Sequence, residues 1–278
     1  VAGLEEAVGG ELLLRLLRHA PVAGENVGAV DLDVPERSGL RRDVDTLDQL
    51  GALAALAEAG ADICAAGTST PSETEAKVKA LGRRFHYERA DFSSIAPVEG
   101  VVKGATTALG SVDILVNNAG TIRRADSVDF SEADWDAVMN VNIKSAFFLA
   151  QAAGRHMIAK GAGKIINIAS MLSFQGGIRV PSYTASKSAI AGVTRLLANE
   201  WAAKGVNVNA IAPGYMATDN TEALRADETR NRDILARIPA GRWGEASDLA
   251  GAAVFLASRA SDYVHGAIIP VDGGWLAR

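Results

Sequence analysis

Three residues in the second half of the chain have the types and spacing of a device that moves protons. Lys187 follows Tyr183 by four positions, and Ser170 precedes Tyr183 by thirteen. If this segment is helical, Tyr183 and Lys187 share a face, and the ammonium favours the ionised phenol. A phenol that ordinarily ionises near pH ~10 then becomes an acid or a base at neutral pH. We expect Ser170, which ends an apolar run, to hold a carbonyl or alcohol oxygen while Tyr183 moves the proton.

A tyrosine and a lysine four positions apart also occur on solvated helix faces, so the pair alone indicates little. Other motifs accompany it in a fixed order along the chain. The apolar run 112–116 leads into Asn117-Asn-Ala-Gly120, a helical stretch carries Asn142, and a later apolar run ends in Pro213-Gly-Tyr-Met-Ala-Thr218. Motifs in this order resemble the short-chain dehydrogenase/reductase family, and the resemblance covers roughly residues 52–278.

The resemblance implies a role for each matched residue. Ser170 would orient the substrate oxygen, and Tyr183 would be the acid or base. Lys187 would also bind the ribose of a nicotinamide cofactor, and Asn142 would hold a water that links Lys187 to solvent. Asp91 is placed where the family contacts adenine, although an Asp after a short strand is equally a helix cap. The implied cofactor-binding residues are Asp91, Asn117, Ala119, Gly120, Tyr183, Lys187, Pro213, Gly214 and Thr218.

Three longer segments indicate the substrate. Residues 117–124, 168–183 and 238–244 are similar to a branch of the family that interconverts 2-dehydro-3-deoxy-D-gluconate and its 2,5-diketo form with NAD(H) in hexuronate catabolism. The alternative substrates are 5-keto-gluconate and a 3-oxoacyl thioester. A guanidinium binds a sugar-acid carboxylate through two parallel hydrogen bonds, although surface arginines are more often solvated. The candidates beside the motifs are Arg123, Arg124 and Arg179.

The N-terminal part departs from the family's pattern. The family's cofactor loop reads Thr-Gly-x-x-x-Gly-x-Gly, because only glycine lets the backbone approach a pyrophosphate closely at a helix N-terminus. Here the three glycine positions fall on Asp43, Leu47 and Gln49. The strand expected before the loop falls on 37–42, which is too charged for a buried parallel strand, and the run 27–34 is a possible substitute.

We therefore divide the chain into an atypical segment, 1–45, and a short-chain dehydrogenase/reductase domain, 46–278. A shifted reading frame or a misjudged start upstream of residue ~50 is one explanation for the atypical segment, with a boundary uncertain by a few positions. Val1 in place of Met agrees with it. The other explanation is a genuine variant, catalytically impaired or silent, whose cofactor site is defective. We favour the first.

Apolar runs alternate with helical stretches along the domain. This alternation predicts a single α/β domain with a Rossmann-like, doubly wound parallel sheet. A charged stretch over 217–237 is expected to form either a helical lid over the substrate or a solvated surface helix. The expected strands are 61–66, 112–116, 164–169, 206–212 and 266–271, and the expected helices are 47–59, 73–81, 94–109, 132–157, 181–203 and 246–258.

Composition excludes some classes of binding partner and indicates the cellular compartment. A net charge of -5 argues against nucleic acid or an anionic membrane as a partner. The four histidines lack ligand spacing, so we expect no catalytic metal, and Cys64 reads as a buried strand thiol. The apolar run 12–17 is too short to span a membrane, and we expect a cytoplasmic protein.

The sequence leaves the cofactor type and the assembly to the resemblance. The segment 65–70 offers neither an acidic side chain for an adenine ribose nor an arginine for a 2′-phosphate, so NAD is expected from the family alone. The stretches 132–157 and 181–203 carry more apolar positions than one face of a sheet can cover. Because the family pairs such helices between subunits, we expect a homotetramer.

Overall fold

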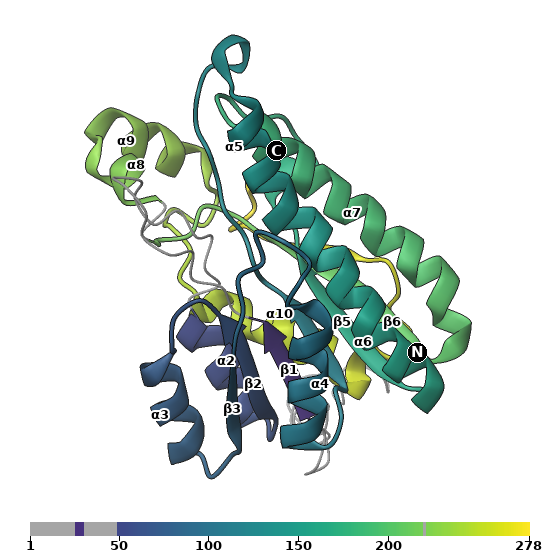
Figure 1. The fold of residues 1–278 in the computed structure, drawn as a ribbon. Coiled ribbons are helices and arrows are strands. Elements are labelled where there is room, and N and C mark those ends of the chain that lie inside the picture. Colours follow the sequence, from purple (N-terminus) through teal and green to yellow (C-terminus); the bar gives the residue numbers. More distant parts are fainter. Residues whose placement is uncertain (1–25, 31–48, 219–220) are drawn as a thin grey trace, which may run out of the picture.

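A computed structural model describes residues 26–30, 49–218 and 221–278 of the chain. The strands are β1 (Asn26–Val30), β2 (Asp62–Gly67), β3 (Phe85–Arg89), β4 (Ile114–Asn117), β5 (Gly163–Ile168), β6 (Val206–Pro213) and β7 (Ile268–Val271). Across the described ranges they form one parallel sheet in the order β3-β2-β1-β4-β5-β6-β7 (Figure 1). The strand order reverses between β1 and β4, and a doubly wound sheet binds ligands outside the carboxyl ends of its strands at such a point. The predicted fold class is confirmed.

Helices cover both faces of this sheet (Figure 1). The helices are α2 (Gln49–Glu58), α3 (Ser72–Ala80), α4 (Val98–Leu109), α5 (Glu132–Met139), α6 (Ala146–Lys160), α7 (Pro181–Trp201), α8 (Glu222–Ala226), α9 (Glu228–Arg237) and α10 (Ser247–Ala257). Cys64 and Leu115 lie in the core with α4, α6 and α7, whereas Ile63 and Ile114 lie in the core with α2, α3 and α10. Neighbouring residues of one strand thus enter opposite cores, which explains why the strands read as continuous apolar runs.

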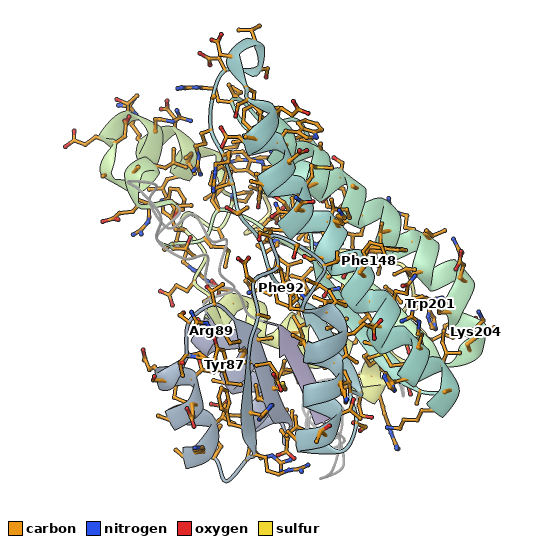
Figure 2. The ribbon with its side chains drawn as sticks, viewed as in Figure 1. Tyr87, Arg89, Phe92, Phe148, Trp201 and Lys204 are labelled. Carbon is orange, nitrogen blue, oxygen red and sulfur yellow. The ribbon has the colours of Figure 1, made fainter. Side chains whose placement is uncertain are left out.

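The two long helices α6 and α7 pack closely together. Gly154 of α6 makes room for Trp201 of α7, because a Cβ at Gly154 would lie 2.8 Å from the indole ring. Phe92 and Phe148 belong to the same core (Figure 2). The close packing fixes α7, the helix that carries Tyr183, against the sheet.

The strand β1 lies inside the sheet, between β2 and β4. Val27 pairs with Ile63 of β2 on one side and with Ile114 of β4 on the other. This strand falls in the run 27–34, the possible substitute for the expected strand. The expected register over 37–42 lies outside the described residues, as do Asp43 and Leu47, and Gln49 is the first residue of α2.

The stretch predicted as one helix over 132–157 is interrupted. A π-helical turn, Asn140–Ser145, separates α5 from α6, and Ser145 donates a hydrogen bond to the carbonyl of Val141 at 2.6 Å. Periodicity does not reveal the extra residue that such a turn accommodates. π turns are frequent at functional sites, and this one carries Asn142.

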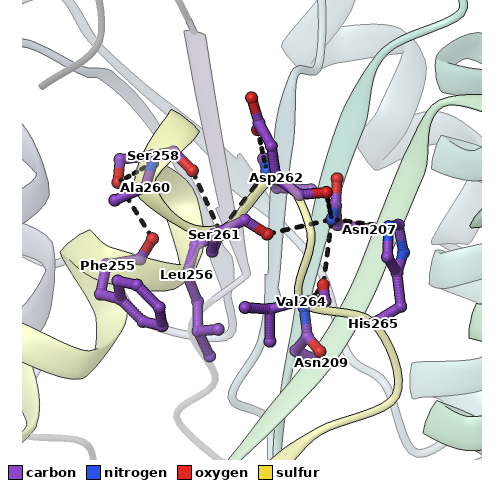
Figure 3. A network of polar contacts seen from close by, with 11 residues as sticks. Asn207, Asn209, Phe255, Leu256, Ser258, Ala260, Ser261, Asp262, Val264 and His265 are labelled. Atoms are coloured by element: carbon purple, nitrogen blue, oxygen red, sulfur yellow. Dashed lines mark hydrogen bonds and ion pairs between the residues drawn. The ribbon is translucent and has the colours of Figure 1, made fainter. Parts of the chain in front are cut away.

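Polar residues inside β6 bind the loop that precedes β7 (Figure 3). Asn209 donates to the carbonyl of Val264 at 2.8 Å and accepts from the amide of Ala267 at 2.9 Å. Asn207 donates to the carbonyls of Asp262 and Val264 at 3.0 Å each. The two asparagines are buried, and their hydrogen bonds to loop carbonyls replace the water that they lose.

The stretch 217–237, predicted to form either a lid or a solvated surface helix, contains α8 and α9, which stand off from the sheet at the carboxyl ends of its strands (Figure 1). α9 begins where the side chain of Asp227 accepts hydrogen bonds from the amides of Thr229 and Arg230. Such a cap satisfies amides that a helix start otherwise leaves unpaired. Within the described ranges, no helix combines the length and the apolar character needed to cross a membrane.

Candidate active site

Tyr183 and Lys187 lie one turn apart on α7, which begins with Pro181 at a position suited to proline. Both side chains are buried, at 6% and 2% exposed. The ammonium of Lys187 lies 5.5 Å from the centre of the Tyr183 ring and donates to the carbonyl of Ile168 at 2.8 Å. The helical spacing therefore places the cation beside the phenol, as the sequence predicts.

Ser170 follows β5 and caps a short 3-10 turn, Met171–Ser173. Its hydroxyl accepts from the amide of Leu172 at 3.2 Å. Ser173 accepts from the amide of Ser170 at 3.3 Å and donates to the carbonyl of Lys187 at 2.5 Å. Ser173 thus ties the turn of Ser170 to α7. Our sequence reasoning missed this residue, although the pattern Ser-x-x-Ser is close to a capping box.

Asn142 is buried, and both polar atoms of its side chain make hydrogen bonds within the protein. The side-chain oxygen accepts from the amide of Thr121 at 2.7 Å, and the side-chain nitrogen donates to the carbonyl of Thr121 at 2.9 Å. The same nitrogen donates to the hydroxyl of Ser186 on α7 at 3.1 Å. Asn142 therefore joins the turn after β4 to the helix of Tyr183. The water that the resemblance assigns to Asn142 stays a prediction.

Beneath these residues runs a ladder of buried polar side chains. Asn117, at the end of β4, donates to the carbonyl of Ala146 at 3.1 Å and to the side chain of Asn167 at 2.9 Å. Asn167 donates in turn to the hydroxyl of Thr194 on α7 at 2.9 Å. The ladder crosses β4, β5 and α7, so the elements that carry the site are held in one register.

The turn after β4 fits part of a nicotinamide dinucleotide. The side-chain oxygens of Asn117 and Asn118 are buried and lack a hydrogen-bond partner among the described residues. Buried acceptors of this kind call for a donor, such as a carboxamide or a ribose hydroxyl. Gly120 is buried, and a Cβ there would lie 3.9 Å from the ammonium of Lys187. Ala119 is buried in the same turn.

The turn after β6 lies at the same edge of the sheet. Gly214 has to be glycine, because a Cβ would lie 2.5 Å from the Cα of Asp272. Pro213 ends the strand, and Thr218 follows with its carbonyl accepting from Arg225 of α8 at 3.1 Å. Asp91 is exposed beyond β3 and accepts from the amide of Ser93 at 2.9 Å within a turn; the next helix, α4, begins at Val98, so Asp91 does not cap it. Its contact with adenine stays a prediction.

The three candidate arginines lie on two loops beside Tyr183. Arg123 is half-buried, and it donates to the hydroxyl of Thr121 at 2.9 Å and lies 3.5 Å from Asp134. Arg124 is exposed. Ile122, next to them, packs with Tyr183 itself.

Arg179 lies on the facing loop and has a strained backbone. Its φ of 63° is the only positive value at a non-glycine residue among those described. Its carbonyl accepts from the amide of Ala125 at 3.2 Å, and its guanidinium lies 3.1 Å from the carboxylate of Asp126. Val180, the next residue, packs with Tyr183. The two arginine-bearing loops are thus fastened to one another at the mouth of the site.

Cys64 lies outside this site, in β2. Burial raises the pKa of the Cys64 thiol to about 12, and Glu88 acts in the same direction. The thiol is therefore protonated and inert at neutral pH, as expected of a buried strand cysteine. In the part of the chain that the structure describes, no three side chains that could bind a metal gather in one place.

Comparison with known proteins agrees with this geometry. Residues 51–276 match the family described as Enoyl-(Acyl carrier protein) reductase. A 2-dehydro-3-deoxy-D-gluconate 5-dehydrogenase from Escherichia coli (strain K12) is 65% identical over 224 residues, which cover 80% of this chain and 88% of that protein.

Two solved structures have the same fold over nearly their whole length. An Agrobacterium tumefaciens protein proposed to be a 2-deoxy-D-gluconate 3-dehydrogenase, solved with bound NADP, is 55% identical with a TM-score of 0.80, covering 91% of this chain and 98% of that one. A gluconate 5-dehydrogenase from Burkholderia cenocepacia J2315, in complex with NADP and tartrate, is 35% identical with a TM-score of 0.81, covering 95% and 99%. The chain belongs to the short-chain dehydrogenase/reductase family, as an enzyme that acts on CH–OH groups.

Proposed function

We propose that this enzyme interconverts 2-dehydro-3-deoxy-D-gluconate and its 2,5-diketo form with a nicotinamide cofactor, in the catabolism of hexuronates. The observation that carries the proposal is the identity of 65% with the E. coli enzyme of that name. The support from geometry is the cation of Lys187 held beside Tyr183, with the turn of Ser170 tied to the same helix.

In the oxidative direction, Tyr183 takes the proton from the hydroxyl on C5 of the sugar acid while C5 gives up its own hydrogen as a hydride, so that C5 becomes a ketone. The cofactor, when bound, supplies the carbon that accepts or returns the hydride. Ser170 orients the substrate oxygen. The ammonium of Lys187 stabilises the ionised phenol of Tyr183 and binds the nicotinamide ribose. Asn142 holds the turn after β4 in place and carries the water that links Lys187 to solvent.

The proposal is tested by assaying the purified chain with the sugar acid and with either oxidised dinucleotide, and by identifying the product as the C5 ketone. Gluconate and a 3-hydroxyacyl thioester, the reduced partners of the two alternative substrates, are the comparison substrates. We expect the sugar acid to have the highest kcat/KM. A higher kcat/KM for the thioester would contradict the proposed substrate while leaving the oxidoreductase chemistry intact.

For the cofactor, NAD is the expectation that comes from the family resemblance, and one observation favours NADP. Arg89 ends β3 directly beside Gly67, the last residue of β2, and is exposed (Figure 2). The carboxyl end of the second strand is where a doubly wound fold holds the adenine ribose, and an arginine there accommodates a 2′-phosphate. Both solved relatives described above contain NADP.

The two cofactors are distinguished by measuring Kd for NADH and NADPH with the unmodified chain and with Arg89→Ala. If Arg89 binds a 2′-phosphate, the substitution weakens NADPH about tenfold or more and leaves NADH unchanged. Equal effects on both dinucleotides would contradict the contact between Arg89 and a 2′-phosphate. NAD would then remain the expected cofactor.

The second candidate function is a catalytically silent chain that keeps the fold. Asp43, Leu47 and Gln49 favour it, because none of them is glycine. Asn142, Ser170, Tyr183 and Lys187 favour an enzyme, and so does the presence of the strand β1 between β2 and β4. Calorimetry with NADH and NADPH decides between them: micromolar binding supports the enzyme, and no binding of either supports the silent chain.

A further inference from the structure

Arg225 on α8 is a cation without a counterion among the residues that the structure describes. The guanidinium is half-buried, and Nη2 donates to the carbonyl of Thr218 at 3.1 Å. The Nε atom is buried and has no hydrogen-bond partner among the described residues. Guanidinium donors withdrawn from water require an acceptor. The described residues provide no acceptor for Nε of Arg225.

Arg225 and its neighbour on α8 contact two turns that carry predicted reactant-binding residues. Thr218, which it holds, is a predicted cofactor contact at the end of the β6 turn. Leu224, the preceding residue on α8, packs in a cluster with Met171, which follows Ser170. α8 therefore lies between the cofactor turn and the substrate turn, at the carboxyl ends of the strands (Figure 1).

Cations of α9 lie close to the cluster that contains Leu224, whereas Glu222 of α8 and Glu228 of α9 are exposed to solvent. Burial raises the pKa of the Tyr215 hydroxyl, while the cations of Arg230 and Arg237 act to lower it. The guanidinium of Arg237 lies 3.9 Å above the ring of Trp275, in the cluster that also contains Leu224. The acidic residue between α8 and α9, Asp227, is used by two backbone amides of α9.

We propose that Arg225 binds an oxyanion of the bound reactants through Nε and Nη2, which can donate two parallel hydrogen bonds to a carboxylate or a phosphate. The inference rests on the proposed function, since that function supplies both anions: the carboxylate of the sugar acid and the phosphates of the dinucleotide. Because Nη2 has two hydrogens, it can keep its bond to Thr218 while it donates to the anion.

The test compares Arg225→Gln with Arg232→Gln. Arg232 lies on α9, is 73% exposed on its side chain and, within the described part of the chain, pairs only with the adjacent Asp233, at 3.4 Å. The control therefore removes the same charge from the same pair of helices without touching the site. Calorimetric titrations with NADH, with NADPH and then with the sugar acid added to the dinucleotide complex measure the two sources of the anion separately.

We expect R225Q, and not R232Q, to weaken at least one of these titrations about tenfold or more. A weaker dinucleotide titration assigns the phosphate, and a weaker sugar-acid titration assigns the carboxylate, provided that an uncharged ketone binds as before. The inference is overturned if R225Q matches R232Q throughout, or if the acid and the uncharged ketone are weakened equally.

A third variant guards against a change in folding. Arg225→Lys keeps the charge but loses the paired donors, so it should also weaken the anion that Arg225 binds, and thermal unfolding checks that each variant is folded. If R225Q does not fold, a lysine variant with unchanged affinities overturns the inference. Turnover of the sugar acid by the unmodified chain tests the proposed function on its own, because none of the titrations requires turnover.

Discussion

At the scale of single residues, the buried ammonium of Lys187 is the feature that most needs explaining. A charge taken out of water requires hydrogen bonds or a partner of opposite charge. Lys187 is 2% exposed, and one of its hydrogen bonds goes to the carbonyl of Ile168. This bond fixes the ammonium at the end of β5, so Tyr183 meets a cation whose position does not depend on solvent.

Replacing Tyr183 with Phe tests the proton transfer directly. The substitution removes one hydroxyl and little contact area, so we expect kcat to fall about a hundredfold or more while dinucleotide binding is retained. Steady-state kinetics and a dinucleotide titration measure the two effects. Tyr263→Phe is the matched control, because Tyr263 is fully exposed, at 100%. Turnover of Y183F within tenfold of the unmodified chain would show that another group moves the proton.

The carboxylate of the substrate gives the second prediction at this scale. If Arg123, Arg124 or Arg179 binds it, alanine at that position should raise KM for the sugar acid about tenfold or more and barely change KM for an uncharged ketone. Arg155→Ala is the control, since Arg155 is an exposed arginine that pairs with Glu99 on α4. Equal effects on both substrates in all three variants would exclude these arginines from a carboxylate role.

At the scale of elements, Ser173 connects the turn of Ser170 with α7. Ser173→Ala removes the donor to the carbonyl of Lys187. We expect kcat to fall severalfold with dinucleotide binding unchanged, and stability to fall by about 1 kcal/mol. Ser188→Ala is the control, because the exposed Ser188 also joins α7 to this turn, through the carbonyl of Leu172 at 3.2 Å. If the two variants have the same kcat, Ser173 does not position Ser170.

Some secondary-structure elements can be predicted from the sequence, whereas others cannot. Residue spacing predicts the pairing of Tyr183 with Lys187, because a helix fixes which positions share a face. Apolar runs predict β2, β4, β5, β6 and β7 to within a few residues, because parallel strands are buried on both faces. β3 is absent from the strands predicted by pattern, since its residues Phe85–Arg89 are only half-buried and carry His, Glu and Arg.

Long-range hydrogen bonds also cannot be predicted from the sequence. Asn142 binds Thr121 across 21 positions, and Asn117 binds Asn167 across 50. Nothing local in the sequence indicates such partners, because the fold brings them together. Arg225 was missed for the same reason: its burial depends on how α8 lies against the rest of the molecule.

At the scale of the whole molecule, apolar side chains remain exposed on the outer helices. Leu196 of α7 is 48% exposed, Trp135 of α5 is 40% exposed and Phe255 of α10 is 37% exposed. We predict that they are covered by further copies of the chain in a homotetramer. Sedimentation at micromolar concentration should give a species of four 28.9 kDa chains, and Leu196→Glu should shift it to a smaller one. A monomer under these conditions would contradict the prediction.

The position of β1 at the point where the strand order reverses has a consequence for local unfolding of the sheet. In the described sheet, β1 is the only strand that pairs with both β2 and β4. The side with β2 and β3 would receive the adenosine, whereas Asn142, Ser170, Tyr183 and Lys187 all belong to the side with β4 to β7. Detachment of this single strand would split the sheet along the middle of the cofactor, so a bound dinucleotide should bridge the split. Amide hydrogen exchange in β1 should therefore slow more on cofactor binding than exchange in β6, which lies well inside one half.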